Sequence, residues 1–387
     1  MACPSCGSER TIANGGGRRK CLSPEHRGSR TYNIDREVSA ELIAEAAQAR
    51  SGWAPEFGIT SPLPLGQKLK GTSTLIDKRT GEQVLQWVKS NEDAEAQQAV
   101  FEAAARAMVE PLRGLAKPIK APARTLQDSL SSYIIGDAHF GLYAWAKEAG
   151  EDFDTAIASQ DLRAAIDRLV HFAPSSRVGY LVDVGDFLHA DSKVAATPQS
   201  GNMLDVDGRF PRVVRVAIEA LKYSIGRMLQ KHETVEVFIT PGNHNPNAAG
   251  MMAMILEAFY SNEPRVKIED SPGLYYYRKF GKNLIGITHG DKVKMADLPS
   301  IMATDRAEDW GATLHRFWWT GHVHHTRHQE YRGCFCESFN TLAASDAWHH
   351  GSGYRSARQM QRIDMDASDG IYQRGIASIG MIRKNAA

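Results

Sequence analysis

Five short stretches of the sequence combine glycine with side chains that bind metal ions, and each follows an apolar run of strand length. The last stretch places His322 and His324 two residues apart, so both would point the same way from a strand. Neutral imidazole is a common metal ligand, and two imidazoles aimed at one place indicate a metal site. The full set is Gly136-Asp137-Ala138-His139, Gly185-Asp186, Gly242-Asn243-His244, His289-Gly290 and Gly321-His322-Val323-His324.

The apolar runs before these stretches predict β-strands, and longer helical patterns separate them. This alternation predicts an α/β domain that begins near residue 126 and continues to residue 387. Ligand sites in such sheets lie beyond the carboxyl ends of the strands, so the five stretches are expected to converge on one site. The expected strands are 132–135, 178–184, 235–240, 284–288 and 317–320, and the expected helices are 155–172, 211–230, 248–260 and part of 296–309.

The converging side chains are two aspartates, one asparagine and four or five histidines. Mixed carboxylate and imidazole donors suit Mn, Fe or Zn rather than Ca. The set is too large for one ion. The sequence therefore predicts two divalent cations, with Mn as the first choice and Fe, Zn or Ni as alternatives.

Taken in order, the five stretches resemble the calcineurin-like metallophosphoesterase superfamily, whose pattern runs D-x-H, GD, GNH, H and GHxH. The match covers roughly residues 130–350. The resemblance implies a four-layer α/β/β/α sandwich and hydrolysis of phosphodiester bonds by a hydroxide that bridges two metals. It implies these roles: Asp137, His139 and His324 on the first metal, Asn243, His289 and His322 on the second, Asp186 bridging both, and His244 donating a proton to the leaving oxygen.

Two positions depart from that pattern. The family often carries an acid after GNH, where this chain has Asn245, and the change is expected to alter how His244 is oriented. Many members have Asp or Asn three residues after the bridging aspartate, where this chain has His189. His189 is expected beside the metal ligands, with a third-metal contact or a substrate contact as alternatives.

The segment 191–212 is long, polar and expected to lie over the metal site as a loop. Arg209 and Arg212 could bind phosphate oxygens with two hydrogen bonds each, or be ordinary surface arginines. The string LDVDGR in this loop, and GTSTL with QWVK between residues 71 and 89, resemble metallophosphoesterases of tailed bacteriophages.

A loop with glycine and tryptophan follows the last metal stretch and carries Asp346, His349 and His350. A substrate role is one interpretation, and surface histidines are the commoner one. Cys334 and Cys336 lie on an expected strand and are interpreted as buried or half-buried thiols rather than a redox pair.

The first 33 residues contain Cys3-x2-Cys6 and Cys21-x4-His26 around a Gly-rich basic turn. Four such ligands suit one structural zinc, which would supply the folding energy that so short a segment lacks. The alternative is a disordered tail with cysteines present by chance. The segment resembles the zinc ribbons of DNA-binding and transposase-like proteins, with His26 in place of the usual fourth cysteine.

Residues 34–125 are predicted to form an accessory α+β region. Helical patterns at 36–50 and 91–109 flank two short strands, 69–76 and 83–89, as in a winged-helix-like module or a packing appendage. Residues 111–124 are basic and rich in proline, which is typical of a linker.

The composition is that of a soluble globular protein, with 42% hydrophobic and 24% charged residues. A formal net charge of +1 excludes a polyanion partner for the whole chain, so a nucleic-acid surface must be local. No signal peptide or membrane span is evident, and a reducing, cytoplasmic location is expected.

The zinc ribbon and the basic linker favour a dimetal nuclease-like phosphodiesterase, with nucleic acid as its substrate or partner. A small-nucleotide phosphodiesterase or phosphatase, and a non-catalytic nucleic-acid-binding scaffold, are the alternatives. No oligomeric state is predicted.

Overall fold

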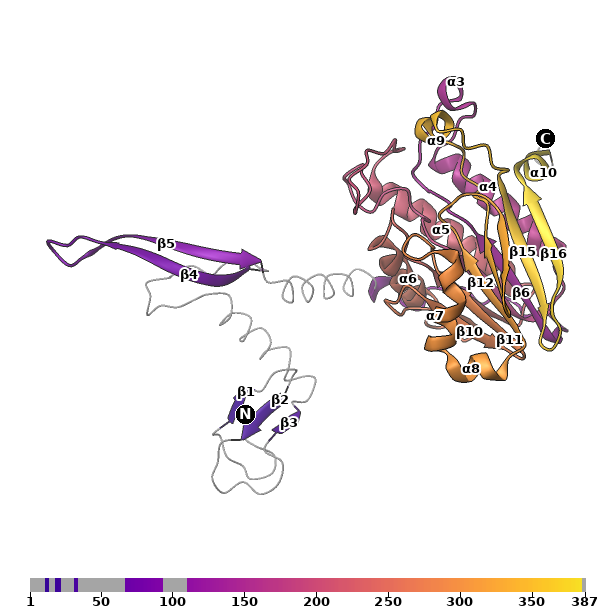
Figure 1. Ribbon diagram of the computed structural model, residues 1–387, viewed down its shortest axis with the longest axis horizontal. Helices are drawn as coiled ribbons and strands as arrows, with labels where there is room; N and C mark the ends of the chain where they lie inside the picture. The colour runs from indigo at the N-terminus through magenta and orange to yellow at the C-terminus, as the bar shows by residue number, and fades with distance from the viewer. Residues whose placement is uncertain (1–10, 14–17, 22–30, 34–66, 93–109, 385–387) are drawn as a thin grey trace. The chain divides into compact units, whose positions relative to one another are not determined.

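The computed structural model describes residues 11–13, 18–21, 31–33, 67–92 and 110–384. The chain divides into two compact units, Met1–Met108 and Val109–Ala387 (Figure 1). The predicted boundaries at residues 33 and 125 stay predictions.

The first unit contains two small antiparallel sheets. Strands β1 (Thr11–Ala13), β2 (Arg18–Cys21) and β3 (Thr31–Asn33) form one. The predicted hairpin is confirmed as β4 (Gln67–Ile76) and β5 (Gln83–Glu92), which pair antiparallel. The helix predicted at 36–50, most of the helix predicted at 91–109, and the predicted zinc ligands Cys3, Cys6 and His26 lie outside the described residues.

A six-stranded sheet forms the centre of the second unit, in the order β16-β15-β6-β7-β8-β9. The four strands from β6 to β9 are parallel, and β15 pairs antiparallel with both β6 and β16. The bounds are β6 (Leu126–Ile135), β7 (Ser176–Asp183), β8 (Thr234–Ile239), β9 (Val266–Ile268), β15 (Gln359–Asp366) and β16 (Gly370–Ser378).

A five-stranded sheet packs on the first, in the order β10-β11-β12-β14-β13. Its three inner strands are parallel, and the edge strands β10 and β13 are antiparallel to their neighbours. The bounds are β10 (Tyr276–Phe280), β11 (Asn283–Ile287), β12 (His315–Thr320), β13 (Arg327–Tyr331) and β14 (Cys334–Ser338).

Helices cover the outer face of each sheet, which gives the predicted α/β/β/α layers. The long amphipathic helices α4 and α5 pack with α6 and α10 on the six-stranded sheet, and α7 and α8 accompany the five-stranded one (Figure 1). The bounds are α3 (Ala146–Ala149), α4 (Thr155–His171), α5 (Phe210–Leu229), α6 (Ala248–Phe259), α7 (Leu298–Asp305), α8 (Ala307–Ala312), α9 (Ala347–Gly351) and α10 (Ile379–Lys384).

The aromatic run in β12 shows how both faces of a sheet are buried. Phe317 and Trp319 enter the core between the sheets, while Trp318 faces α7 and donates its indole N–H to the Leu298 carbonyl at 2.8 Å. Cys334 and Cys336 are buried, as predicted, in the same outer core as Trp318.

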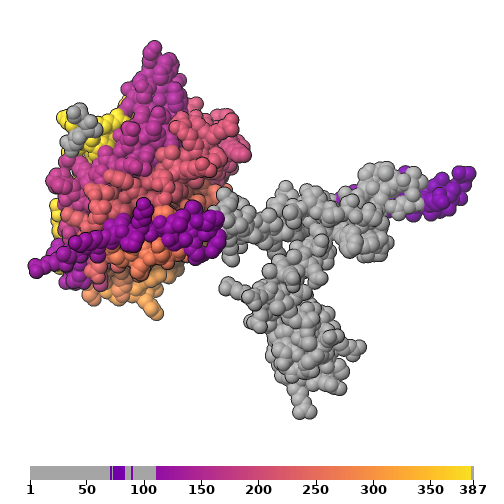
Figure 2. Space-filling view, turned by 180° about the vertical axis from the view of Figure 1, so that it is seen from behind, coloured from indigo at the N-terminus to yellow at the C-terminus, as the bar shows by residue number. Residues whose placement is uncertain are grey.

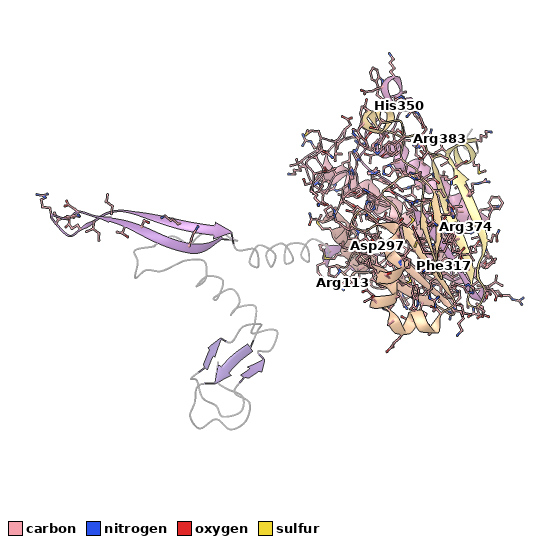
Figure 3. All side chains as sticks on the ribbon, viewed as in Figure 1. Arg113, Asp297, Phe317, His350, Arg374 and Arg383 are labelled. Carbon is pink, nitrogen blue, oxygen red and sulfur yellow. The ribbon has the colours of Figure 1, made fainter. Side chains whose placement is uncertain are left out.

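Ion pairs join the two sheets, such as that between Arg278 on β10 and Glu236 on β8 at 2.9 Å. The guanidinium of Arg374 on β16, labelled in Figure 3, donates to both carboxylate oxygens of the fully buried Glu337 on β14; these two distances are 2.6 and 2.8 Å. Nε2 of His328 on β13 also lies 3.0 Å from the Glu337 carboxylate, so this buried acid has two partners.

The segment 110–125 lies on the surface of the second unit, where the short helix η2 (Glu110–Leu112) begins it (Figure 2). The N–H groups of Gly114 and Ala116 donate to the carbonyls of Ala258 and Phe259, at 2.9 and 3.1 Å. Arg265 reaches the Ile119 carbonyl at 2.8 Å. The predicted linker is therefore packed along part of its length. No helix among the described residues is long and apolar enough to cross a membrane.

Candidate metal centre

The ends of the predicted strands bring the predicted ligands together in two groups. Asp137, His139 and His324 form one group, and Asp186, His289 and His322 form the other, each with ligand atoms within 4.8 Å of one another. The parallel pairs β6–β7–β8 and β11–β12 end at one edge of the sandwich, which is why segments up to 185 residues apart meet.

In the first group, Nε2 of His139 lies 3.1 Å from Nε2 of His324. Nε2 of His324 is also 3.5 Å from a carboxylate oxygen of Asp137. Asp137 and His139 are fully buried, and both Asp137 oxygens accept the backbone N–H of His322, at 2.9 and 3.0 Å. Two imidazole nitrogens and a carboxylate oxygen are suitable donors for a divalent cation.

In the second group, Nε2 of His289 faces two oxygens, Oδ2 of Asp186 at 3.1 Å and Oδ1 of Asn243 at 3.0 Å. Its Nδ1 donates to the Val184 carbonyl at 3.0 Å, which leaves Nε2 as the nitrogen available for a metal in the neutral ring. The Asp186 carboxylate also accepts the backbone N–H of His244 at 2.8 Å.

Backbone strain is concentrated on these same residues. Among the described residues, the non-glycine positions with positive φ are Asp137 (39°), His139 (45°), Asp186 (54°), His322 (69°) and His324 (56°). Each left-handed residue costs roughly 1–3 kcal/mol. Five together cost roughly as much as the 5–15 kcal/mol that stabilises a whole domain. The fold places this strain on the residues whose side chains converge.

The glycines of the five stretches leave room for the donors. A Cβ atom on Gly242 would lie 2.1 Å from Oδ1 of Asp186, and one on Gly321 would lie 2.6 Å from Oδ2 of Asp137. A Cβ on Gly185 would lie 2.4 Å from Nδ1 of His289. The backbone therefore approaches the donors so closely that only glycine fits.

The buried carboxylates of the metal centre are stabilised by positive charge nearby. Burial would raise the pKa of Asp186, but His289 and hydrogen bonds from His289 and the His244 backbone lower it to about 2. Burial would likewise lower the pKa of His289, but the Asp186 and Asp137 carboxylates raise it to about 10. Burying carboxylates without a cation is costly, and divalent cations would replace the proton on His289 in this balance. Donor types, burial and charge thus fit the two cations predicted.

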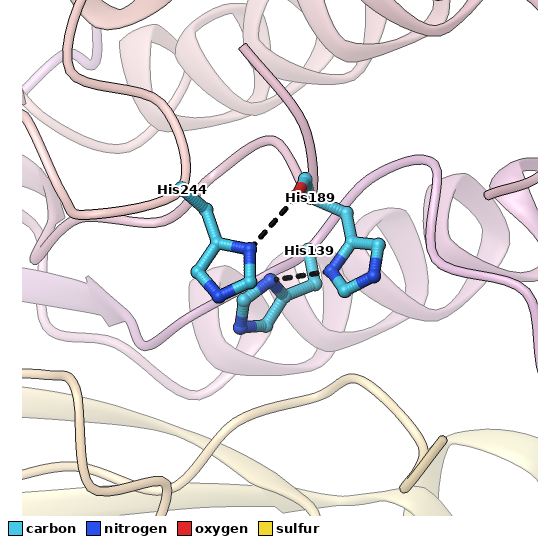
Figure 4. A group of neighbouring side chains, drawn as sticks. All are labelled: His139, His189 and His244. Atoms are coloured by element: carbon cyan, nitrogen blue, oxygen red, sulfur yellow. Dashed lines mark hydrogen bonds between the residues drawn. The ribbon is translucent and has the colours of Figure 1, made fainter. Parts of the chain in front are cut away.

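His139, His189 and His244 form a third group whose ring nitrogens lie within 4.8 Å of one another (Figure 4). Nδ1 of His244 donates to the His189 carbonyl at 2.8 Å, so this contact rather than an acid at position 245 sets the ring orientation. Asn245 is buried and accepts the Gly242 N–H at 3.3 Å. Nδ1 of His189 lies 3.1 Å from Nδ1 of His139. Burial, followed by His244, lowers the pKa of His189 to about 3, so the ring is neutral.

The loop after β14 contradicts the interpretation of His349 as a surface histidine. Its ring stacks on the His324 ring with centroids 4.9 Å apart, and its Nδ1 contacts Oδ1 of the buried Asp346 at 2.7 Å.

The sequence analysis did not identify Asp183, which is fully buried at the end of β7. Burial raises the pKa of this carboxyl group well above its usual value. A polar residue ending a buried strand was the available signal for Asp183.

The two predicted phosphate contacts, Arg209 and Arg212, do not line the cavity of the metal donors. Asn243, His244, His322 and His324 line a cavity of ≈ 680 Å³. Arg209 precedes α5 and lines a separate cavity of ≈ 420 Å³ with Lys193, and neither Arg209 nor Arg212 lines the larger one.

No protein-family model and no curated protein matches the sequence. Solved structures with a similar course of the chain include a dimetal phosphatase from Danio rerio, with 7% identity over 64% of this chain and 98% of that one, at a TM-score of 0.35. Vacuolar Protein Sorting 29 from Cryptosporidium parvum has 15% identity over 65% and 96%, at 0.28. A predicted phosphoesterase from Streptococcus pneumoniae has 11% identity over 65% and 98%, at 0.26.

Proposed function

We propose that the chain is a calcineurin-like metallophosphoesterase that hydrolyses phosphodiester bonds with two divalent cations, and that its substrate is nucleic acid. The observation that carries the proposal is the coincidence of backbone strain and donor chemistry: the five strained residues are all predicted ligands. Residues with strained backbone conformations cluster at active sites and ligand-binding sites in proteins.

The residues divide into two sets of donors around Asp186. Asp137, His139 and His324 would hold one cation, and Asn243, His289 and His322 would hold the other, with the Asp186 carboxylate shared between them. Cations bound there would supply Lewis-acid catalysis to a phosphoryl group.

We assign His244 the role of a proton donor rather than that of a metal ligand. Its Nδ1 is fixed by the His189 carbonyl, so Nε2 is the nitrogen free to hold a proton, and the side chain lines the cavity of the metal donors. A proton donated from Nε2 to the leaving alkoxide would assist departure of a poor leaving group.

Basic side chains outside the centre support a nucleic-acid substrate. Lys117, Lys120 and Arg124 are exposed on the surface segment 110–125, and Lys78 and Arg79 are exposed at the tip of the β4–β5 hairpin. Exposed cations contribute to phosphate binding that weakens as salt rises.

The experiment measures hydrolysis by the full chain with Mn²⁺ against DNA, RNA, cyclic nucleotides, phosphate monoesters and bis(p-nitrophenyl) phosphate. We expect diesters to be cleaved and the metal content to be two ions per chain in the dimetal centre. The His244→Asn variant should retain both ions and lose about 10²–10⁴-fold on DNA. Its loss on the nitrophenyl diester should be much smaller, because nitrophenolate leaves without a proton.

The matched control is His171→Asn, since His171 is exposed at the end of α4. It should behave as the wild-type chain on both substrates. Equal losses on DNA and the nitrophenyl diester in His244→Asn would assign His244 to phosphate positioning. Absence of any diester hydrolysis with both metals bound would refute the proposed function.

A further inference from the structure

Two exposed aromatic rings form one wall of the cavity that holds the metal donors. Trp348 in α9 is 64% exposed and Tyr354 is 40% exposed, with ring centroids 5.8 Å apart and planes tilted by 32°. Both line the ≈ 680 Å³ cavity together with Asn243 and His244. Single exposed aromatics are ordinary in proteins, but two adjacent rings facing a cluster of metal donors are a feature to be explained.

The aromatic wall is anchored to the metal centre. Asp346 caps α9 by accepting the His349 N–H at 2.8 Å and contacts the His349 ring at 2.7 Å. Three rings are in contact in a row. The His349 ring stacks on the His324 ring and meets the Trp348 ring in a T-shaped arrangement, and both centroid distances are 4.9 Å. The Tyr354 N–H donates to the His349 carbonyl at 3.0 Å. Trp348 is thus held two ring contacts from a predicted metal ligand.

The loop 197–204 supplies other lining groups of the cavity. Its turn is closed by the Thr197 N–H, which donates to the Asn202 carbonyl, and by the Asn202 N–H, which donates to the Thr197 hydroxyl, both at 2.9 Å. Met203 is 83% exposed and lines the cavity with Ser200 and Asn202. The cavity therefore combines flat aromatic surface, a flexible thioether and short polar side chains, which is the chemistry that binds a planar ring with polar edges.

We propose that Trp348 and Tyr354 form a stacking subsite for an unpaired nucleobase attached to the scissile phosphodiester. The inference rests on the proposed function and specifies its substrate as a single-stranded or unpaired nucleic-acid end. A paired base is already stacked within its duplex, whereas an unpaired base offers a free face to an aromatic side chain. Arg355 follows Tyr354 and is exposed; one guanidinium nitrogen donates to the carbonyls of His350 and Tyr354, at 3.1 and 2.7 Å, which holds its charge beside the subsite.

Binding is measured first, with the full chain and without added Mn²⁺, so that turnover is suppressed while the predicted structural zinc is not removed by a chelator. Fluorescence anisotropy compares labelled (dT)10 with an abasic decamer that has the same number of phosphates, and with a ten-base-pair duplex. We expect Trp348→Ala to weaken (dT)10 binding by about 5- to 100-fold, the range of one lost base stack. The abasic decamer and the duplex should lose little, and Trp348→Phe should restore most of the affinity. The control Phe172→Ala removes an exposed ring at the end of α4 and should change nothing.

Equal losses on (dT)10 and the abasic decamer, or unchanged (dT)10 binding in Trp348→Ala, would overturn the subsite. A cyclic mononucleotide that binds wild-type chain more tightly than (dT)10, and loses that affinity in Trp348→Ala, would overturn the assignment to a strand. The Mn²⁺ hydrolysis assay is read separately. A base-dependent loss of binding without any diester hydrolysis would reject the proposed function while retaining the subsite.

Discussion

Adding one methyl group at Gly242 should disable the metal centre without removing any donor. Gly242 precedes Asn243 in the loop after β8, and its φ is not in the left-handed region, so alanine is conformationally allowed there. The obstacle is space: the new Cβ would lie 2.1 Å from Oδ1 and 2.5 Å from the backbone nitrogen of Asp186.

The size of the effect follows from these distances. Ordinary contacts of a Cβ atom are 3.4–4 Å, so Asp186 and the Gly242 loop must separate by ~1 Å or more. Overpacking of this kind costs about 1–3 kcal/mol of stability. A displacement of about 1 Å at a catalytic centre can lower the rate by about 10²-fold. We expect Gly242→Ala to fold, to bind metal more weakly and to lose about 10²-fold in kcat/KM.

Three measurements check this expectation: urea unfolding, metal content after dialysis, and Mn²⁺-dependent hydrolysis of bis(p-nitrophenyl) phosphate. Gly250→Ala is the matched control. Gly250 is an exposed residue of α6 with no atom within 4 Å of an added Cβ. Alanine there should stabilise the helix by about 0.5–1 kcal/mol and leave the activity unchanged.

A Gly242→Ala variant with wild-type metal content and turnover would refute the reasoning, since Asp186 would then tolerate displacement. A Gly242→Ala chain that fails to fold would be produced again at lower temperature rather than replaced by Gly242→Ser, because serine carries the same Cβ atom and would clash at least as much. If that variant folds with full activity, the close approach of Gly242 to Asp186 has no functional consequence.

Asp186→Asn should lose most of the bound metal and nearly all turnover, because one carboxylate is proposed to contact both cations; metal analysis beside the diesterase assay checks this. Cys3→Ser with Cys6→Ser should release one zinc and weaken nucleic-acid binding, while nitrophenyl diester turnover stays near the wild-type level; collapse of that turnover would contradict independent units. Burial lowers the pKa of His232 to about 3, below its unfolded value of about 6.5, so its contribution to stability is full above pH 6.5 and is lost as the pH falls toward 3. Urea midpoints between pH 7 and 4 should therefore fall more steeply for the wild-type chain than for His232→Gln, and parallel curves would exclude this role.

The sequence alone determined the strands that carry the donors and the types of those donors. Each of the runs before Asp137, Asp186, Asn243, His289 and His322 is apolar and of strand length, so local pattern was sufficient. The helices α4, α5 and α6 were recoverable for the same reason, because their periodicity is local.

Long-range pairing was decided only in three dimensions. The antiparallel strands β15 and β16 complete the sheet that begins with β6, yet more than 200 residues separate β15 from β6. Residues 111–124 resemble a linker by composition, but their backbone finds carbonyl partners at the end of α6. Composition records the proline content and carries no information about such partners.

The surroundings of the donors were likewise a tertiary result. His349 has the local sequence of a surface loop, and its contact with His324 arises because the loop after β14 folds back over the end of β12. The positive φ values of Asp137, Asp186 and His324 were also fixed by the fold, although Asp and His adopt this conformation more readily than other non-glycine residues. Side-chain type and strand period are properties of neighbouring residues, whereas strain and ring stacking depend on contacts between distant segments, which only the packed fold supplies.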